Sequence, residues 1–558
     1  MKRYLPLIFL LLIVFLGFTS RFYLLGKAPA GLYLDEAAQG YNAYSILKTG
    51  KDEFGKPFPV AFRSFGDFKT PVYIYLIAPL IPLFGLNSFS IRFPSFIFSI
   101  LTLPLLYLLI KKLCPQNKDA TLTALFSTLF LAISPWHTLF GRTNFECNVA
   151  LFLMLLGYYL FLLGLQKPLW LLFSAVSFAA ALPAYHSERL LVPLILLFLL
   201  SKYWPVVTSI SYRSYLLFSL LVGLLLILPT LKILATPGFM ARVSTLNIFS
   251  TPLSLLPGFL PNYSGPFAWL INSHLFLSLK EFFSLYSFYF SPRSLFFLGD
   301  SGPRSSFPEL SVFYTWQLPL YLYGLYLLFT DKQFKDLRSF VILFLFLSPI
   351  PAALTRDPFS TIRSLPLVIP ITIVMALACQ KILSFLATLK TKLLFWFIFS
   401  LLIIYSLAKL YSSAIILNEY YRASYWDYGW EQVADTIKTL DPKLPVVVDN
   451  ARGEPYSQLL VFLQYDPQNY QTENFEVTPG EYYTNMSRNT NKKIGNITTR
   501  GIEWITDRRK KQYLVGDYLS ISPEQIVTNH LLLIKEIYYP DGSPAFRIVK
   551  TQPEKILR

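Results

Sequence analysis

The sequence predicts a polytopic α-helical membrane protein with about eleven spans and a small C-terminal α/β domain on the outer face. Three observations predict this fold class: an apolar composition, long apolar windows that recur along the chain, and basic residues placed between those windows. The chain has 558 residues, of which 54% are hydrophobic and 15% are charged. Because about 25% of the residues in soluble domains are charged, we expect most of this chain to lie in a bilayer.

The apolar windows are long enough, with their flanks, to cross a hydrocarbon core of about 30 Å. The first is "LPLIFLLLIVFLGF" and the last is "LLFWFIFSLLIIYSL". We expect spans at roughly 4–25, 88–110, 119–138, 148–165, 168–184, 189–205, 213–231, 311–330, 338–354, 364–386 and 392–411.

The formal net charge of +17 does not indicate a nucleic-acid partner, because the basic residues lie singly or in pairs between apolar runs. If Lys2 and Arg3 lie inside, alternating crossings place twelve later basic residues inside as well: Lys111, Lys112, Lys118, Lys167, Lys202, Arg213, Lys332, Lys335, Arg338, Lys381, Lys390 and Lys392. This is the positive-inside pattern. An odd number of spans then puts the C-terminus on the outer side of a plasma or inner membrane.

Two apolar segments need a separate interpretation. Counting "TPVYIYLIAPLIPLFGL" as a crossing would move the later Lys-rich loops outside, so we expect it to lie along the outer interface. The N-terminal run has an alternative as a cleaved signal peptide, because "KAPAG" supplies small residues after an apolar core. Both interpretations leave the loop that follows on the outer side.

The predicted domains are a transmembrane domain at 1–411 and an extracytoplasmic α/β domain at 412–558. The first contains two outer loops, at 26–87 with interfacial helices and at 232–310, the latter rich in Pro, Ser and aromatic residues. In the second, "WEQVADTIKTL" and "PYSQLLVFLQY" have helical spacing, "LPVVVDN" is typical of a buried strand, and "LLLIKEIYYPDGSPAFRIVK" predicts two strands around Asp-Gly.

Two adjacent acids, Asp35 and Glu36, follow the first span among aromatic residues, in "GLYLDEAAQGYNAYSILKTG". Ionisable residues at membrane depth mark a functional site when they face the interior of a bundle. Other ionisable residues are predicted at the outer ends of spans, where they could converge on one cavity: Asp67, Lys69, Arg142, Glu146, His186, Glu188, Arg189, Arg356 and Arg363.

Each candidate also has a structural alternative. Asp35 is placed to cap a helix beginning at "EAAQGYNAYSILK", and Glu146 could pair with Arg142 four residues earlier. The "YHSERL" segment is typical of an interfacial anchor as well as of a site. The two arginines in "TRDPFSTIRSLP" could only mark an interface.

A series of segments in this order resembles the GT-C membrane glycosyltransferases. It consists of the first outer loop with Asp-Glu, then "FKTPVYIYLIAPLIPLFGLNSFSIRFPSFIFSILT", then "LAISPWHTLFGRTNFECNVALF". Within them the chain is most similar, over nearly its whole length, to the family-39-like group with protein O-mannosyltransferases and lipid A aminoarabinose transferases. The resemblance implies a polyprenyl-phosphate-linked sugar donor, an outer-face cavity, and a protein, lipid or glycan acceptor.

The resemblance also implies residue roles. Asp35 matches the family's catalytic acid and would act as general base, with Glu36 as its neighbour, and Glu146 in "RTNFE" matches a further acid. Lys69 matches a lysine associated with the lipid phosphate, whereas Asp67 is displaced by one residue from the family's acid.

The remaining candidates are assigned to substrate binding. Arg356 and Arg363 would meet the leaving phosphate, for which the planar guanidinium is suited, and the others are Arg142, His186 and Arg189. No cofactor is indicated with certainty, and a divalent metal ion is an open alternative.

Two other functions remain as alternatives. A transporter or flippase for a lipid-linked substrate would use buried acids for protons or substrate, but the sequence has no inverted repeat and no matching pair of broken helices. A polymerase or ligase of polyprenyl-linked glycans would depend on basic and His residues of the large outer loops more than on Asp35.

Overall fold

The computed structural model describes residues 4–115, 119–237, 247–331 and 335–555. Four of the basic residues used to orient the chain, Lys2, Arg3, Lys118 and Lys332, lie outside these ranges. The chain divides into two compact units. Unit 1 comprises Met1–Tyr23, Ser95–Ala235 and Phe239–Ser413, and unit 2 comprises Leu24–Pro94, Thr236–Gly238 and Ala414–Arg558.

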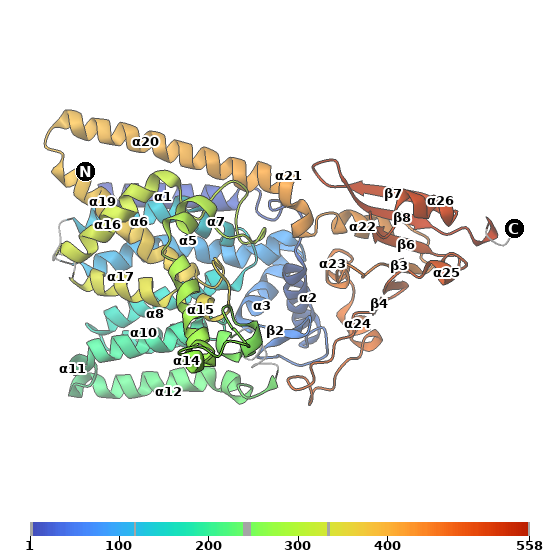
Figure 1. Cartoon of the computed structure of the whole chain (residues 1–558), viewed down its shortest axis with the longest axis horizontal. Helices are drawn as coiled ribbons and strands as arrows, with labels where there is room; N and C mark the ends of the chain where they lie inside the picture. The colour runs from blue at the N-terminus through green and yellow to red at the C-terminus, as the bar shows by residue number, and fades with distance from the viewer. Residues whose placement is uncertain (1–3, 116–118, 238–246, 332–334, 556–558) are drawn as a thin grey trace. The chain divides into compact units, whose positions relative to one another are not determined.

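Unit 1 is a bundle of helices (Figure 1). Its main helices are α1 (Leu5–Phe22), residues 95–113 of α5 (Ser88–Leu113), α6 (Ala120–Ile133), α7 (Pro135–Phe140), α8 (Glu146–Gly164), α9 (Leu169–Ala181), α10 (Glu188–Lys202), α12 (Ile210–Lys232), α16 (Leu318–Thr330), α17 (Lys335–Leu347), α18 (Ile350–Leu354), α19 (Val368–Phe385) and α20 (Leu389–Tyr411). Every predicted span overlaps at least one of these helices, although α16 covers only Leu318–Thr330 of the predicted span at 311–330.

Seven helical segments among the described residues are long and apolar enough to cross a membrane: Leu5–Phe22, Ser88–Leu113, Glu146–Gly164, Ile210–Lys232, Lys335–Leu354, Leu365–Phe385 and Leu389–Trp426. The predicted spans at 119–138 and 168–184 fall on shorter apolar helices, Ala120–Ile133 and Leu169–Ala181. The prediction of many apolar membrane helices is therefore confirmed, and the number of crossings stays a prediction.

The outer helices of the bundle bury only one side. In α1 the buried residues are Leu10, Ile13, Gly17 and Arg21, three or four positions apart, whereas Leu11 and Phe15 are more than half exposed. In α12 the only buried residue is Ser219. Helices that are apolar on all sides and exposed on most of them are typical of helices that face lipid.

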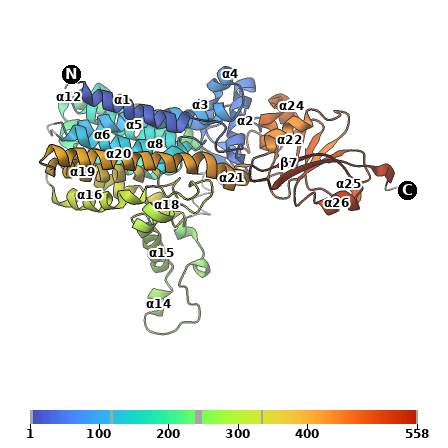
Figure 2. The ribbon, with the colours of Figure 1, turned by 90° about the horizontal axis from the view of Figure 1, so that it is seen from above.

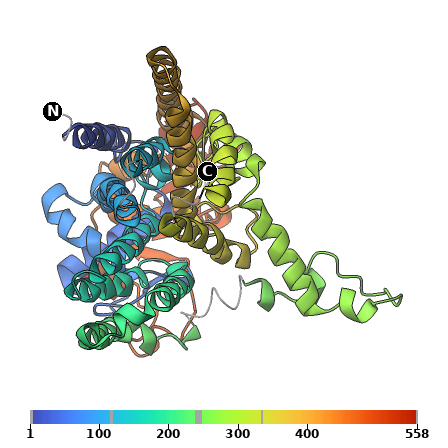
Figure 3. The ribbon, with the colours of Figure 1, turned by 90° about the vertical axis from the view of Figure 1, so that its left-hand side faces the viewer.

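Among its described residues, the predicted outer loop at 232–310 contains the α-helices α14 (Ala268–Ile271) and α15 (His274–Phe288). Figure 2 shows α14 standing away from the helix bundle of unit 1, and Figure 3 shows the same green segment projecting sideways when the bundle is viewed end on. The assignment of this segment as an outer loop stays a prediction.

The C-terminal part of unit 2 is a six-stranded sheet in the order β4-β5-β3-β6-β8-β7. The strands are β3 (Val446–Val448), β4 (Lys492–Ile494), β5 (Ile497–Thr499), β6 (Tyr513–Asp517), β7 (Leu532–Tyr538) and β8 (Pro544–Lys550). β3 pairs in parallel with β5 and β6, and the other pairs are antiparallel. β3 is wholly apolar and buried, as expected for a central parallel strand covered on both faces.

Helices α22 (Trp430–Ile437), α23 (Tyr456–Phe462), α24 (Pro467–Glu473), α25 (Trp504–Asp507) and α26 (Pro523–Thr528) complete this part. The predicted helices in "WEQVADTIKTL" and "PYSQLLVFLQY" are α22 and α23. The predicted strand pair around Asp541 and Gly542 is the β7–β8 hairpin. The prediction of a C-terminal α/β domain is confirmed.

The N-terminal part of unit 2 is the first outer loop of the sequence prediction. It contains α2 (Leu34–Thr49), a hairpin of β1 (Phe62–Ser64) and β2 (Asp67–Lys69), and a broken helix formed by α3 (Pro71–Ile77), η1 (Ala78–Leu80) and α4 (Ile81–Phe84). The hairpin turns at Phe65 and Gly66, which both have positive φ. Two such residues in succession match the right-handed twist of a two-residue hairpin loop.

Candidate active site

The first turn of α2 holds the two acids that open the first outer loop. The N-terminal N–H groups of a helix have no backbone carbonyl partner within the helix and need other acceptors. In α2 the Tyr33 N–H donates to Glu36 Oε2 at 3.2 Å, and the Leu34 N–H donates to Asp427 Oδ2 at 2.8 Å. Tyr33, and not Asp35, is the N-cap residue, so the helix-cap alternative for Asp35 is wrong.

Asp35 pairs with Lys69, the cation that the family resemblance associates with the lipid phosphate. Lys69 Nζ lies 2.9 Å from Asp35 Oδ1, and the two side chains are 14% and 28% exposed, respectively. Lys69 ends β2, and Pro71 begins α3 two residues later. The strand end therefore brings an ammonium group to the first turn of α2, where the pair remains accessible to solvent.

Glu36 has a different environment from its neighbour. Its carboxylate accepts hydrogen bonds from Arg92 Nε at 2.9 Å and from Arg92 Nη2 at 2.7 Å, and the side chains are 1% and 0% exposed. Arg92 also donates to the carbonyls of Pro29 and Gly31. A buried ion pair needs this complete hydrogen bonding to offset its desolvation, so Glu36 and Arg92 hold the loop at 29–36 against the first turn of α5.

Sequence reasoning missed Arg92. The residue was within the quoted segment "SIRFPSF", and the available signal was a single arginine at the start of an otherwise apolar span. The planar guanidinium explains why arginine stands here, since it binds both carboxylate oxygens of Glu36 and two carbonyls at once.

Asp67 lies on the same short strand as Lys69. It begins β2, opposite Ser64 of β1, and its side chain shares a face with that of Lys69 because side chains alternate along a strand. Phe68 points to the other face, where it is buried against the rings of Tyr482 and Tyr483.

The donor set around Asp35 does not fit a divalent metal ion. The carboxylates of Asp35 and Glu36 are paired with Lys69 and Arg92. Within the part of the chain that the structure describes, no group of three or more His, Cys, Asp or Glu side chains could hold a metal.

Unit 1 contains the other candidates. Arg142 is buried, and its Nη1 donates to the carbonyls of Ser20 at 2.9 Å and Arg21 at 3.2 Å. Arg142 thereby satisfies acceptors in the last turn of α1, where a cation is favoured by the helix dipole. Glu146 is the first residue of α8, with its side chain partly exposed.

The turn before α10 and the loop before α19 lie side by side. Ser187 Oγ donates to the carbonyl of Arg363 at 3.2 Å, and this contact brings His186 and Arg189 into the same neighbourhood. The Arg363 guanidinium pairs with the Asp357 carboxylate.

Arg356 has a positive φ of 61°. Non-glycine residues adopt this backbone conformation at an energetic cost, and such residues cluster at functional sites.

Two side chains fix the loop at 355–364. The Thr361 N–H and hydroxyl both donate to Asp300 Oδ2 at 2.8 Å. Trp136 Nε1 donates to the Thr361 carbonyl at 2.9 Å. The structure therefore connects α7, in the "SPWHTLFGRTNFE" segment, with the loop that bears Arg356 and Arg363.

A second buried cluster in unit 2 was missed by sequence reasoning. Burial raises the pKa of Asp52 to about 6, against the hydrogen bonds that it accepts from Tyr482 and from the backbone. Burial likewise raises the pKa of Glu53 to about 8, although Asn42 Nδ2 donates to Glu53 Oε1 at 2.9 Å. Lys492 and Glu476, which also interact with Glu53, come from the C-terminal part of the chain, so only the fold reveals this cluster.

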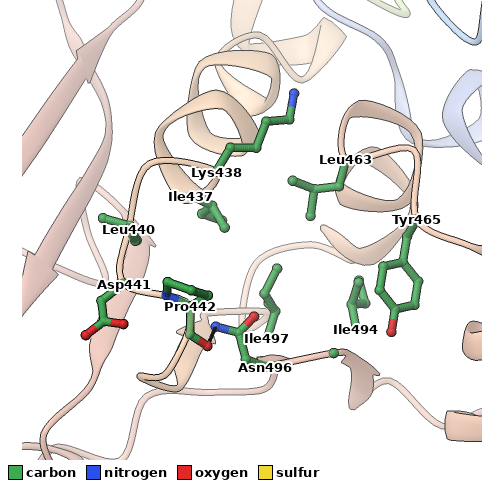
Figure 4. A pocket seen from close by; sticks show the side chains of 11 residues that line it. Ile437, Lys438, Leu440, Asp441, Pro442, Leu463, Tyr465, Ile494, Asn496 and Ile497 are labelled. Carbon is green, nitrogen blue, oxygen red and sulfur yellow. Dashed lines mark hydrogen bonds between the residues drawn. The ribbon is translucent and has the colours of Figure 1, made fainter.

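The C-terminal sheet also contains a hollow of about 290 Å³ between the ends of α22 and α23 and the β4–β5 turn (Figure 4). Its lining is largely aliphatic, with the Asn496 amide bonded to the Pro442 and Leu444 carbonyls at one side. None of the acids or cations discussed above lines it, so it is separate from the candidate active site.

Comparisons with known proteins bear on the family. The family model described as dolichyl-phosphate-mannose-protein mannosyltransferase matches residues 68–233. The solved structure of ArnT from Cupriavidus metallidurans bound to undecaprenyl phosphate aligns over 97% of both chains, at 12% identity and a TM-score of 0.50. The resemblance to the GT-C glycosyltransferases is confirmed.

Two further structures are similar to this chain, both of the Archaeoglobus fulgidus oligosaccharyltransferase at 12% identity. One, tethered with an acceptor peptide, aligns over 98% of this chain and 74% of the other with a TM-score of 0.49. The other, in complex with Zn and sulfate, aligns over 96% and 72% with a TM-score of 0.47. The search of curated proteins gives no match.

Proposed function

We propose that the protein is an integral membrane glycosyltransferase that transfers a sugar from a polyprenyl-phosphate donor to an acceptor on the outer face. The observation that carries the proposal is the accessible Asp35–Lys69 pair, with Nζ and Oδ1 2.9 Å apart. The pair places a base for the acceptor beside a cation for the leaving phosphate. The family match, which includes Lys69, and the solved relative with bound undecaprenyl phosphate support the same donor class.

Asp35 acts as the general base in this proposal. Its carboxylate accepts the proton of the acceptor hydroxyl as the oxygen attacks the anomeric carbon of the donor. The bond between that carbon and the phosphate oxygen breaks, and polyprenyl phosphate leaves with the bonding electron pair. The proton remains on Asp35 until water removes it.

Lys69 binds the phosphate of the donor. In the structure its ammonium group is held by Asp35, and an ammonium has three N–H donors. A phosphate that approaches Lys69 draws the ammonium away from Asp35 or shares it. Either result leaves an oxygen of Asp35 available to accept the proton, so donor binding prepares the base.

The other candidates keep supporting roles. Glu36 positions Asp35 through its buried pair with Arg92, and Glu146 acts as a further acid of the site. The residues that we assign to substrate binding, besides Lys69, are Asp67, Arg142, His186, Arg189, Arg356 and Arg363.

The membrane arrangement also belongs to the proposal. We assign eleven spans, residues 1–411 as the transmembrane domain and 412–558 as the extracytoplasmic domain. The packing of the first outer loop with 414–558 in unit 2 supports a common side for both.

The test is transfer by the purified protein. The protein is supplied separately with polyprenyl-phosphate mannose, glucose, galactose and arabinose, each in the presence of lipid, protein and glycan acceptors. The products are identified by mass spectrometry. We expect one donor to be consumed by the wild type and far more slowly by Asp35→Asn. Donor consumption at equal rates by both proteins would refute the assignment of the base.

A further inference from the structure

We propose that the loop at 474–491 of the C-terminal domain braces the β1–β2 hairpin and that Tyr482 is a positioning residue for Lys69. The inference rests on the proposed function, since it concerns the lysine assigned to the donor phosphate. It adds a contribution of the C-terminal domain to donor binding.

Tyr482 connects three parts of unit 2. Its hydroxyl donates to the Asp52 carboxylate and accepts the Arg63 N–H at 2.7 Å. Its ring lies edge-on to Phe68, with centroids 5.8 Å apart. The hydroxyl and ring are buried, so each of these contacts is shielded from water.

The neighbouring residue supplies a second contact to the hairpin segment. The Tyr483 hydroxyl accepts the Val60 N–H at 3.1 Å, and its ring packs 5.7 Å from Phe68. Phe68 of β2 is thus in contact with two tyrosine rings of the loop.

Arg63 ties the same hairpin to both ends of the loop. Its guanidinium donates to the carbonyls of Asn485 and Ser487. Arg63 Nε also lies 3.8 Å from Glu476 Oε2, and Lys492 pairs with the same carboxylate. All these side chains are buried, and buried ion pairs persist only in a well-defined geometry.

The register of the hairpin transmits this support to Lys69. Arg63 of β1 pairs with Phe68 of β2, and Phe62 pairs with Lys69. Each strand has three residues, and an isolated two-stranded hairpin is marginally stable in water. The position of Lys69 therefore depends on contacts from outside the hairpin, and Tyr482 makes them through the Arg63 N–H and Phe68.

The decisive experiment is a double-mutant cycle on binding of undecaprenyl phosphate to the purified full-length protein. Tyr482→Phe keeps the ring and removes the hydroxyl, and we expect it to weaken binding about tenfold. In a Lys69→Ala background the same substitution should have no further effect, because it acts through Lys69. Tyr465→Phe is the matched control, since that hydroxyl donates to a carboxylate of the same domain, Glu473.

A purely structural role gives a different result. It predicts that the losses of undecaprenyl phosphate affinity caused by Tyr482→Phe and Lys69→Ala multiply, or that Tyr482→Phe has the affinity of the wild type. Either outcome overturns the inference and leaves the proposed function intact. Normal binding by Lys69→Ala overturns the phosphate assignment of the proposed function together with this inference. If Tyr482→Phe does not fold, Tyr483→Phe, which removes the acceptor of the Val60 N–H, takes its place with the same expected outcomes.

Discussion

Lys69 Nζ lies 2.9 Å from Asp35 Oδ1, and this ion pair joins the end of β2 to the first turn of α2. The next acid, Glu36, is paired with Arg92 in the interior. Successive residues of a helix point about 100° apart. The Asp35 carboxylate is therefore accessible to solvent, whereas the Glu36 carboxylate is buried. The accessible Asp35–Lys69 pair can exchange its contacts for contacts with a substrate. The buried Glu36–Arg92 pair holds the backbone of the preceding loop.

The first prediction concerns Asp35→Asn. Asparagine keeps the size of the side chain and removes the proton acceptor, so we expect the transfer rate to fall by about 10²–10⁴. The melting temperature should change little, because Tyr33, Glu36 and Asp427 provide the N-terminal contacts of α2. Transfer rate, undecaprenyl phosphate affinity and melting temperature are measured on the same preparation. An active Asp35→Asn protein would end the catalytic assignment.

The second prediction concerns the buried pair. Arg92→Ala leaves the Glu36 carboxylate without its partner in the interior, and breaking such a pair costs about 3–5 kcal/mol. We expect a large drop in melting temperature. Arg452→Ala is the control, because Arg452 pairs with Asp517 near the surface, and an exposed pair contributes only about 0–1 kcal/mol. Equal drops for the two variants would contradict a supporting role for Arg92.

The third prediction is a pH dependence of stability from Glu53. Burial raises the pKa of Glu53 from its ordinary value of 4.5 to about 8 in the folded protein. Between these values the folded protein binds more protons than the unfolded chain, so this contribution to stability is complete below pH 4.5 and is lost as the pH rises through 8. The raised pKa of Asp52 changes the stability in the same direction between pH 3.8 and about pH 6.

Glu53→Gln tests this dependence. Glutamine cannot ionise, and its carbonyl can still accept from Asn42. We expect the melting temperature of the wild type to fall from pH 5 to pH 9 and that of Glu53→Gln to fall less. Asn42, Lys492, Asp52 and Glu476 are the groups that interact with Glu53, and they are unchanged in this comparison. Identical slopes for the wild type and the variant would show that Glu53 does not carry the effect.

The fourth prediction concerns sidedness. Lys51 and Lys493 are exposed residues of unit 2, one in the first outer loop and one in the C-terminal domain. In intact cells, Lys51→Cys and Lys493→Cys should both react with a membrane-impermeant thiol reagent. Cys114, Cys147 and Cys379 are buried, so the wild type is a low-background control. Labelling of only one of the two variants would contradict a common outer side.

The sequence by itself determined where the long apolar helices and the C-terminal α/β domain lie. Desolvation of an apolar side chain is a local and nearly additive quantity, so windows such as "LPLIFLLLIVFLGF" locate α1 without knowledge of its neighbours. Alternation and turn residues similarly located the β7–β8 hairpin. The acidic pair was also visible, because two carboxylates in an apolar context are rare.

The tertiary structure decided the partner of each charge. Glu36 meets Arg92 at a separation of 56 residues, and Tyr482 meets Asp52 at a separation of 430. Coulomb and hydrogen-bond energies depend on distance and local dielectric, and neither is encoded in the spacing along the chain. For this reason the sequence left the helix cap open as an alternative to the base for Asp35. In the fold, Glu36 and Asp427 accept from the helix terminus, and Asp35 pairs with Lys69.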